Sequence, residues 1–331
     1  MLNQENMVLK ERPKFCVLEV SYRCLLQCKM CNYWTIQEDP KEIGINNFFK
    51  FVTSLKQFVN SPFEMNISGG EPLLKEGTLD LVEFIAQQGF RFSLVTNGYL
   101  ITEAIARRIA DSGLNFLAIS LDSLDEHVHD NIRGVKGSYQ RIIKALEYFS
   151  VYRGKLQNLT LQTVIMEFNV SGILKLAQWA HDHNISLSFI AICRPNMADP
   201  DIQWYKDKRF SHLWPKEPKK VIEVIDQLIK LKNKGYRIDN PCGQLERFKV
   251  YFTNPEKFIK DTPCSLGTDF LHVNPHGDVH LCCEMDAIGN IANDGIAELW
   301  VSQKAQEIRR SIKCCKKNCA SMVNCYRGPV A

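Results

Sequence analysis

Short apolar runs alternate with amphipathic helical patterns from residue 15 to about residue 192. The apolar runs have the length of buried strands, and the segments between them have the period of helices that cover one face of a sheet. Repeated strand–helix units build parallel sheets, and six of them form an incomplete barrel. We therefore predict an α/β fold: a partial (βα)6 barrel followed by a cysteine-rich α+β module. Strands are expected at residues 15–20, 63–68, 92–96, 116–121, 159–166 and 186–192, and helices at residues 46–59, 78–88, 102–111, 139–152 and 170–183.

Three cysteines follow the first predicted strand with the spacing C-x3-C-x2-C, at Cys24, Cys28 and Cys31. Closely spaced thiolates are the usual ligands of iron–sulfur clusters, and three of them leave one iron of a four-iron cluster without a protein ligand. That iron can bind a substrate or a cofactor. A structural zinc site and a group of buried thiols are the alternatives that the three cysteines alone leave open.

Glycines and polar residues follow the later strands at their carboxyl ends, the edge that carries reactive groups in such barrels. Paired glycines let the backbone approach a ligand closely, although such a pair is also an ordinary turn. Side chains two residues apart on a strand lie on one face. For a carboxylate just beyond a strand, a helix cap is the alternative. The candidates are Gly69, Gly70 and Glu71 after the second strand, Asn97 after the third, Ser120 and Asp122 at the end of the fourth, and Arg133 beyond them.

The three cysteines and the Gly-Gly-Glu-Pro segment at residues 69–72 together resemble the radical S-adenosylmethionine (SAM) enzymes. The resemblance implies that the open iron chelates the amino and carboxylate groups of SAM, and that one electron from a [4Fe-4S] cluster cleaves SAM to a 5'-deoxyadenosyl radical. It also implies that the 69–71 segment receives the SAM amino group. Asn97, Ser120 and Asp122 match the ribose-contacting region. Arg133 is expected either to face the SAM carboxylate or to stabilise a loop.

Seven cysteines lie between residues 264 and 325, around a predicted β-hairpin at residues 273–279. Their spacing, C-x12-G-x4-C and then C-C-x3-C-x5-C, resembles the SPASM module that carries auxiliary clusters in one branch of these enzymes. The full pattern has further cysteines, so we expect a shortened, twitch-like module with one auxiliary [4Fe-4S] cluster. A zinc site with the same thiolates is the alternative. The expected ligands are Cys264, Cys282, Cys319 and one of Cys315, Cys314 or Cys325, and Cys283 can replace Cys282.

Several prolines interrupt the region between the barrel and this module, among them Pro195, Pro200, Pro215, Pro218 and Pro241, and a single clear helix is expected there at residues 219–234. We predict three parts of the chain: a barrel at residues 1–193, a connector and substrate wall at 194–263, and the cluster module at 264–331.

The composition limits the compartment in which the protein can work and the partners that it can bind. Thirteen cysteines without a signal peptide suit metal ligation in a reducing compartment better than disulfides. The net charge is only +4 with scattered basic residues, which does not indicate nucleic-acid binding. The apolar runs fall short of the roughly 20 residues that cross a bilayer. We expect a cytoplasmic protein without nucleic-acid or membrane partners, reduced by an external one-electron donor such as flavodoxin or ferredoxin.

The fate of the substrate radical decides the product. Electron transfer to the auxiliary cluster gives oxidation, whereas hydrogen donation by a thiol gives an epimer. Cys193 and Cys242 are the unassigned thiols that can donate hydrogen, and an inert buried cysteine is the alternative for each.

The fourteen or so residues before the first strand are too few for the leader-binding domain of peptide-maturing relatives. We therefore expect a small-molecule substrate, such as a sugar, an aminosugar or another secondary-metabolite precursor, that is oxidised or epimerised. A maturase that crosslinks or epimerises a ribosomal peptide is the alternative. A non-catalytic iron–sulfur or zinc-binding protein is the remote alternative.

Overall fold

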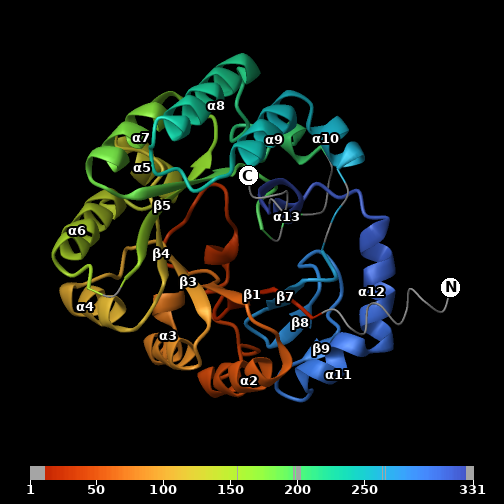
Figure 1. Ribbon diagram of the computed structural model, residues 1–331. Coiled ribbons are helices and arrows are strands. Elements are labelled where there is room, and N and C mark those ends of the chain that lie inside the picture. Colours follow the sequence, from red (N-terminus) through yellow and green to blue (C-terminus); the bar gives the residue numbers. More distant parts are fainter. Residues whose placement is uncertain are drawn as a thin grey trace.

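The computed structural model describes residues 12–154, 156–196, 198, 203–262, 264 and 266–325. Six parallel strands lie in the order β6-β5-β4-β3-β2-β1 and curve into part of a barrel, with helices along the outside (Figure 1). This confirms the predicted partial (βα)6 barrel, and each strand ends within one residue of its predicted bounds. The strands are β1 (Phe15–Glu19), β2 (Glu64–Ser68), β3 (Arg91–Thr96), β4 (Phe116–Ser120), β5 (Asn158–Ile165) and β6 (Ser186–Ala191).

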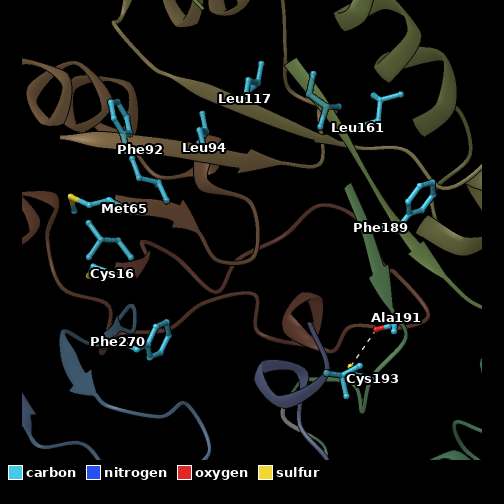
Figure 2. Close-up of a cluster of buried hydrophobic side chains, with 14 of the residues drawn as sticks. Cys16, Met65, Phe92, Leu94, Leu117, Leu161, Phe189, Ala191, Cys193 and Phe270 are labelled. Atoms are coloured by element: carbon cyan, nitrogen blue, oxygen red, sulfur yellow. Dashed lines mark hydrogen bonds between the residues drawn. The ribbon is translucent and has the colours of Figure 1, made fainter. Parts of the chain in front are cut away.

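Residues of each strand point alternately to the outer helices and to the barrel interior. On β1, Cys16 and Leu18 are fully buried beneath the helices, whereas Val17 and Glu19 on the opposite face are only partly buried. Figure 2 shows the apolar layer continuing over neighbouring strands through side chains such as Phe92. Full burial of such a side chain stabilises the fold by about 1.5–3 kcal/mol. The opposite, interior face is more polar and partly open, at Glu19, Asn66, Ser93, Gln162 and Ser188.

Helices cover the outer face of the strands. One of them, α5, is absent from the sequence prediction because its polar sequence, EHVHDNIR, offers only a narrow apolar stripe. The side chain of Asp125 caps α5 by accepting from the N–H groups of His127 and Val128, and α5 ends at Gly134, whose φ is +72°. The helices are α2 (Ile45–Phe58), α3 (Thr78–Gln87), α4 (Glu103–Asp111), α5 (Glu126–Arg133), α6 (Ser138–Val151), α7 (Ile173–Asp182) and α8 (Pro218–Asn233).

The cysteine-rich module joins the barrel sheet. Strand β7 (Phe270–Val273) pairs in parallel with β1, and β8 (Asp278–His280) and β9 (Gly289–Asn290) continue the sheet as antiparallel strands. The predicted hairpin is therefore confirmed as β7–β8. Beyond the predicted α8, the connector holds two further helices, α9 and α10, that the sequence prediction missed. The remaining helices are α9 (Cys242–Thr253), α10 (Pro255–Asp261), α11 (Ile296–Val301), α12 (Gln303–Lys313) and α13 (Ala320–Asn324).

Within the described ranges, none of these helices combines the length and the apolar character needed to cross a bilayer.

Candidate active site

The loop after β1 carries the three cysteines of the C-x3-C-x2-C motif at the carboxyl edge of the sheet. Cys28 is buried, and Cys24 and Cys31 are partly exposed. The N–H of Cys31 donates to the carbonyl oxygen of Cys28 at 3.1 Å. Among the described residues, no three His, Cys, Asp or Glu side chains converge closely enough to hold one metal ion.

The glycine pair after β2 packs directly against the backbone that leads into this cysteine loop. The N–H of Gly70 donates to the carbonyl oxygen of Ser21 at 2.8 Å. A Cβ atom on Gly70 would lie 2.3 Å from the carbonyl oxygen of Tyr22 and 2.4 Å from that of Arg23. Gly69 has a φ of +134°, and its Cβ atom would lie 2.3 Å from the oxygen of Ser21. Only glycine allows this approach, so the pair positions the cysteine loop.

The end of α5 holds the same loop from the other side. The N–H groups of Gln27 and Lys29 donate to the carbonyl oxygens of Arg133 and Ile132, at 3.0 and 2.9 Å. A Cβ atom on Gly134 would lie 2.3 Å from the oxygen of Gln27. The loop is therefore held between the glycine pair and the helix that the sequence prediction missed.

Glu71 is fully buried and ties the end of β3 to the glycine turn. Its carboxylate accepts from the Thr96 hydroxyl and the Asn97 N–H, both at 2.8 Å, and from the Leu73 N–H at 3.1 Å. Burial raises the pKa of Glu71. The side-chain amide of Asn97 lies 3.7 Å from the Sγ of Cys24. In this structure the Glu71 carboxylate therefore orients Asn97 toward the cysteine loop.

Asp122 and Arg133 form a buried ion pair beneath Cys28. The Nε of Arg133 lies 2.7 Å from the Oδ2 of Asp122, and its Nη1 lies 3.8 Å from the Sγ of Cys28. The Val164 N–H donates to the other carboxylate oxygen at 3.0 Å. Burial opposes the charge of Arg133, but Asp122 and Cys28 outweigh it and raise the pKa of the guanidinium. A positive charge thus lies beside the thiol that a cluster would need as thiolate.

Ser120, the last residue of β4, and His129 of α5 lie near Asp122. Ser120 pairs in register with Gln162 of β5 and is 9% exposed. The Asp122 N–H donates to the Nδ1 of His129 at 3.2 Å. Burial and, to a smaller extent, Arg133 lower the pKa of His129 to about 4, so the ring is neutral. The predicted roles of Ser120 and Asp122 at a ribose stay predictions, and both Asp122 oxygens already have protein partners.

The loop thiols fit a metal cluster better than they fit free thiolates. Burial raises the pKa of Cys24 to about 11 and that of Cys31 to about 12, and it also raises that of Cys28. Iron ligation must therefore displace their protons. Three thiols, the side-chain amide of Asn97 and a buried guanidinium match the needs of an anionic iron–sulfur cluster, because hydrogen bonds to sulfur and local charge stabilise such clusters.

The module carries a second group of thiols. Cys282 and Cys319 are buried, and Cys264 and Cys315 are partly exposed. Burial raises the pKa of Cys319 to about 12, and the nearby thiols of Cys283 and Cys264 contribute to the shift. The thiols of the Cys282–Cys283 pair interact, which raises the pKa of Cys282 and lowers that of Cys283. The expected ligand set remains a prediction, with Cys314 and Cys325 at exposed positions.

The two thiols predicted as hydrogen donors lie apart from each other. Cys193 follows β6 and is buried, with its thiol 3.3 Å from the carbonyl oxygen of Ala191. Cys242 begins α9, is partly exposed, and lies 3.9 Å from the side-chain oxygen of Asn233. Hydrogen donation by either thiol stays a prediction.

A buried polar bridge that the sequence analysis missed links the cysteine loop to β7. The Tyr33 hydroxyl donates to the carboxylate of Glu19 at 2.9 Å, and the Nε2 of His272 lies 3.1 Å from the same carboxylate. Burial favours the neutral carboxyl, but His272 and Tyr33 together lower the pKa of Glu19. The sequence contained one indication of this bridge, since Glu19 is the single charged residue of an otherwise apolar strand.

Comparison with known families identifies the class. The family described as "Radical SAM superfamily" matches residues 18–186, and "SPASM: Iron-sulfur cluster-binding domain" matches residues 264–326. The first match spans more than half of the chain, so this protein belongs to the radical SAM superfamily, with a SPASM module. Its cofactors are SAM, a [4Fe-4S] cluster and auxiliary iron–sulfur clusters.

Similar proteins span most of the chain. The "PqqA peptide cyclase" of Bradyrhizobium diazoefficiens is 22% identical over 93% of this chain and 78% of its own. The "AdoMet-dependent heme synthase" of Methanosarcina barkeri is 23% identical over 87% of this chain and 82% of its own. Streptococcus suis SuiB bound to the precursor peptide SuiA has a TM-score of 0.71 and 17% identity, covering 96% of this chain and 74% of that one. This last likeness concerns the fold alone.

These comparisons correct one prediction. A small-molecule substrate was preferred over a peptide because the segment before β1 is short. One of the relatives above is named for a peptide substrate, a second is described with a precursor peptide bound, and none is named for a sugar or a polyol. The preference is therefore wrong. The error lies in the premise, because the length of the amino-terminal segment does not report what the barrel binds.

Proposed function

We propose that this chain is a radical SAM maturase that modifies a peptide, by a crosslink or another oxidation. The observation that carries the proposal is its similarity, over 93% of its length, to a peptide cyclase. The presence of a SPASM module supports an oxidative outcome, because an auxiliary cluster can accept the electron of a substrate radical.

In the proposed reaction, Cys24, Cys28 and Cys31 hold the cluster that binds SAM. With both cofactors bound, the site supplies a 5'-deoxyadenosyl radical that removes a hydrogen atom from the substrate. The protein contributes position and charge. Asn97 donates toward Cys24, and Arg133 places a positive charge beside Cys28. Both are held by buried carboxylates, so little reorganisation is needed when the cofactors bind.

The backbone at residues 69–70 and the side chains of Asn97 and Ser120 are proposed to line the SAM site. Glu71 and Asp122 are proposed to act mainly as positioning residues, since Glu71 accepts hydrogen bonds from Thr96 and Asn97, and Asp122 accepts one from Val164 and is ion-paired with Arg133. The interior-facing polar side chains of Gln162 and Ser188 lie at the same level as Ser120 on the next two strands. They offer hydrogen-bonding groups to a substrate in the barrel interior.

The peptide proposal is tested with the reconstituted protein under anaerobic conditions, with dithionite, SAM and synthetic peptides that correspond to short reading frames beside its gene. We expect one peptide to lose hydrogen atoms by mass spectrometry and to raise 5'-deoxyadenosine formation about tenfold or more, since substrate binding favours the productive geometry. The Cys28→Ala variant is the control, and it should leave the peptide unchanged. Steady SAM cleavage with every peptide unaltered would contradict the substrate proposal and leave the radical SAM assignment standing.

A further inference from the structure

Cys193 lies outside both cysteine motifs, yet it packs against the cysteine-rich module. It follows β6 of the barrel and is only 8% exposed. Figure 2 shows its side chain just beyond the end of β6, next to the ribbon of α13. Phe189 and Ala191, two and four residues earlier, are buried on the outward face of the strand. Cys193 itself lies two residues beyond the end of the strand.

Hydrogen bonds of Asn324 join Cys193 to the residue before Cys325. The side-chain amide of Asn324 donates to the Sγ of Cys193 at 3.1 Å and to the carbonyl oxygen of Ala191 at 3.0 Å. The Ala191 N–H returns a hydrogen bond to the amide oxygen of Asn324 at 2.9 Å. The end of α13 is therefore fixed to the end of β6, with the thiol of Cys193 beside it.

The hydroxyl of Tyr251 joins Cys193 to Asn318, the residue before Cys319. The hydroxyl of Tyr251, a fully buried residue of α9, interacts with the Cys193 thiol. The same hydroxyl lies 3.4 Å from the side-chain oxygen of Asn318, which is 2% exposed. Cys319 and Cys325 flank the two ends of the five-residue helix α13. Cys193 thus faces the neighbours of both module cysteines.

The surroundings of Cys193 differ from those of an inert buried thiol. Cys16 is fully buried in the apolar core, and its thiol donates to the carbonyl oxygen of Val17, as the Cys193 thiol does to that of Ala191. Cys193 also receives an N–H from Asn324, the kind of hydrogen bond that stabilises a thiolate or an iron-bound sulfur. The thiols of Cys319 and Cys325 are near enough to interact electrostatically with the Cys193 thiol. Three thiols therefore gather at this end of β6.

We propose that Cys193 is an iron ligand of an auxiliary cluster, together with Cys319 and Cys325. The barrel would then contribute one thiolate to a cluster whose other ligands belong to the SPASM module. This role replaces hydrogen donation by Cys193, because a sulfur bound to iron has no hydrogen atom to give. The proposal holds for any substrate, since it concerns the cofactor alone.

Iron content and electron paramagnetic resonance (EPR) test the proposal in the full chain. Cys24, Cys28 and Cys31 are first replaced by alanine, so that only auxiliary iron remains. In this background we expect Cys193→Ala to lose about four iron atoms per chain, or to keep iron with an altered EPR spectrum after dithionite reduction. Cys16→Ala is the matched control, because it removes another buried thiol of the barrel, and it should keep both the iron and the spectrum.

A second variant separates ligation from folding. Cys193→Ser keeps the size of the side chain and can accept the hydrogen bond from Asn324, but its hydroxyl is a poor iron ligand. We expect its iron-free form to melt at the temperature of the parent protein, while its iron content or EPR spectrum changes. The proposal is overturned if Cys193→Ser and Cys193→Ala both match Cys16→Ala in iron content and in spectrum.

Discussion

Gly70→Ala is expected to lower 5'-deoxyadenosine formation about a hundredfold and to remove most of the iron held by Cys24, Cys28 and Cys31. The new Cβ atom would lie 2.3 and 2.4 Å from the backbone oxygens of Tyr22 and Arg23, which cannot rotate away as a side chain can. The cysteine loop must therefore shift by on the order of 1 Å, a displacement that can cost about a hundredfold in rate. Anaerobic assays of product and of iron per chain measure the effect.

Gly44→Ala is the matched control for this prediction. A Cβ atom there meets nothing within 4 Å, and the φ of Gly44 is −64°, which alanine adopts readily. We expect Gly44→Ala to keep the parent's iron content and rate. If Gly70→Ala behaves like Gly44→Ala, the glycine pair does not position the cysteine loop.

Asp122→Asn is expected to lower the free energy of unfolding of the iron-free protein by about 3–5 kcal/mol, because it leaves the charge of Arg133 buried without its partner. The ion pair spans 2.7 Å, and its side chains are 0% and 9% exposed. Asparagine keeps an oxygen that can accept from the Val164 N–H, so the substitution tests mainly the charge. Denaturant unfolding followed by circular dichroism measures the change.

Two further variants are compared with Asp122→Asn in the same unfolding measurement. Glu147→Ala breaks an exposed ion pair with Lys144, in which both side chains are 58% exposed, and should cost less than about 1 kcal/mol. The double variant Asp122→Asn/Arg133→Met should recover part of the loss, because the uncompensated charge is gone. A cost for Asp122→Asn no larger than that for Glu147→Ala would show that the pair does not stabilise the site.

The fold could be predicted because its strands repeat a local pattern. Alternating apolar runs located all six barrel strands, and a Pro-His-Gly-Asp turn located the β7–β8 hairpin. Helix α5 was missed, because its eight residues include five charged or histidine side chains and its stability comes from the Asp125 cap and from packing. Pairing of β7 with β1 joins segments more than 250 residues apart, which local periodicity cannot show.

The site was predictable by position more than by role. The sequence predicted that Glu71 and Asp122 lie at the carboxyl edge of the sheet. Their hydrogen bonds to Thr96 and Val164, and the ion pair of Asp122 with Arg133, form only after folding. The glycine pair was expected to make room for a ligand, and the structure shows that it makes room for the cysteine loop. The roles of these residues therefore follow from contacts between distant segments, which the spacing of residues along the chain does not reveal.

The central claim is that three cysteines hold a cluster with an open iron that cleaves SAM. The direct measurement is 5'-deoxyadenosine formation by the anaerobically reconstituted protein with dithionite and SAM, compared with its Cys28→Ala variant. The account predicts 5'-deoxyadenosine from the parent protein and none from the variant. Equal amounts from both proteins, or none from a parent protein that carries zinc in place of iron, would contradict it.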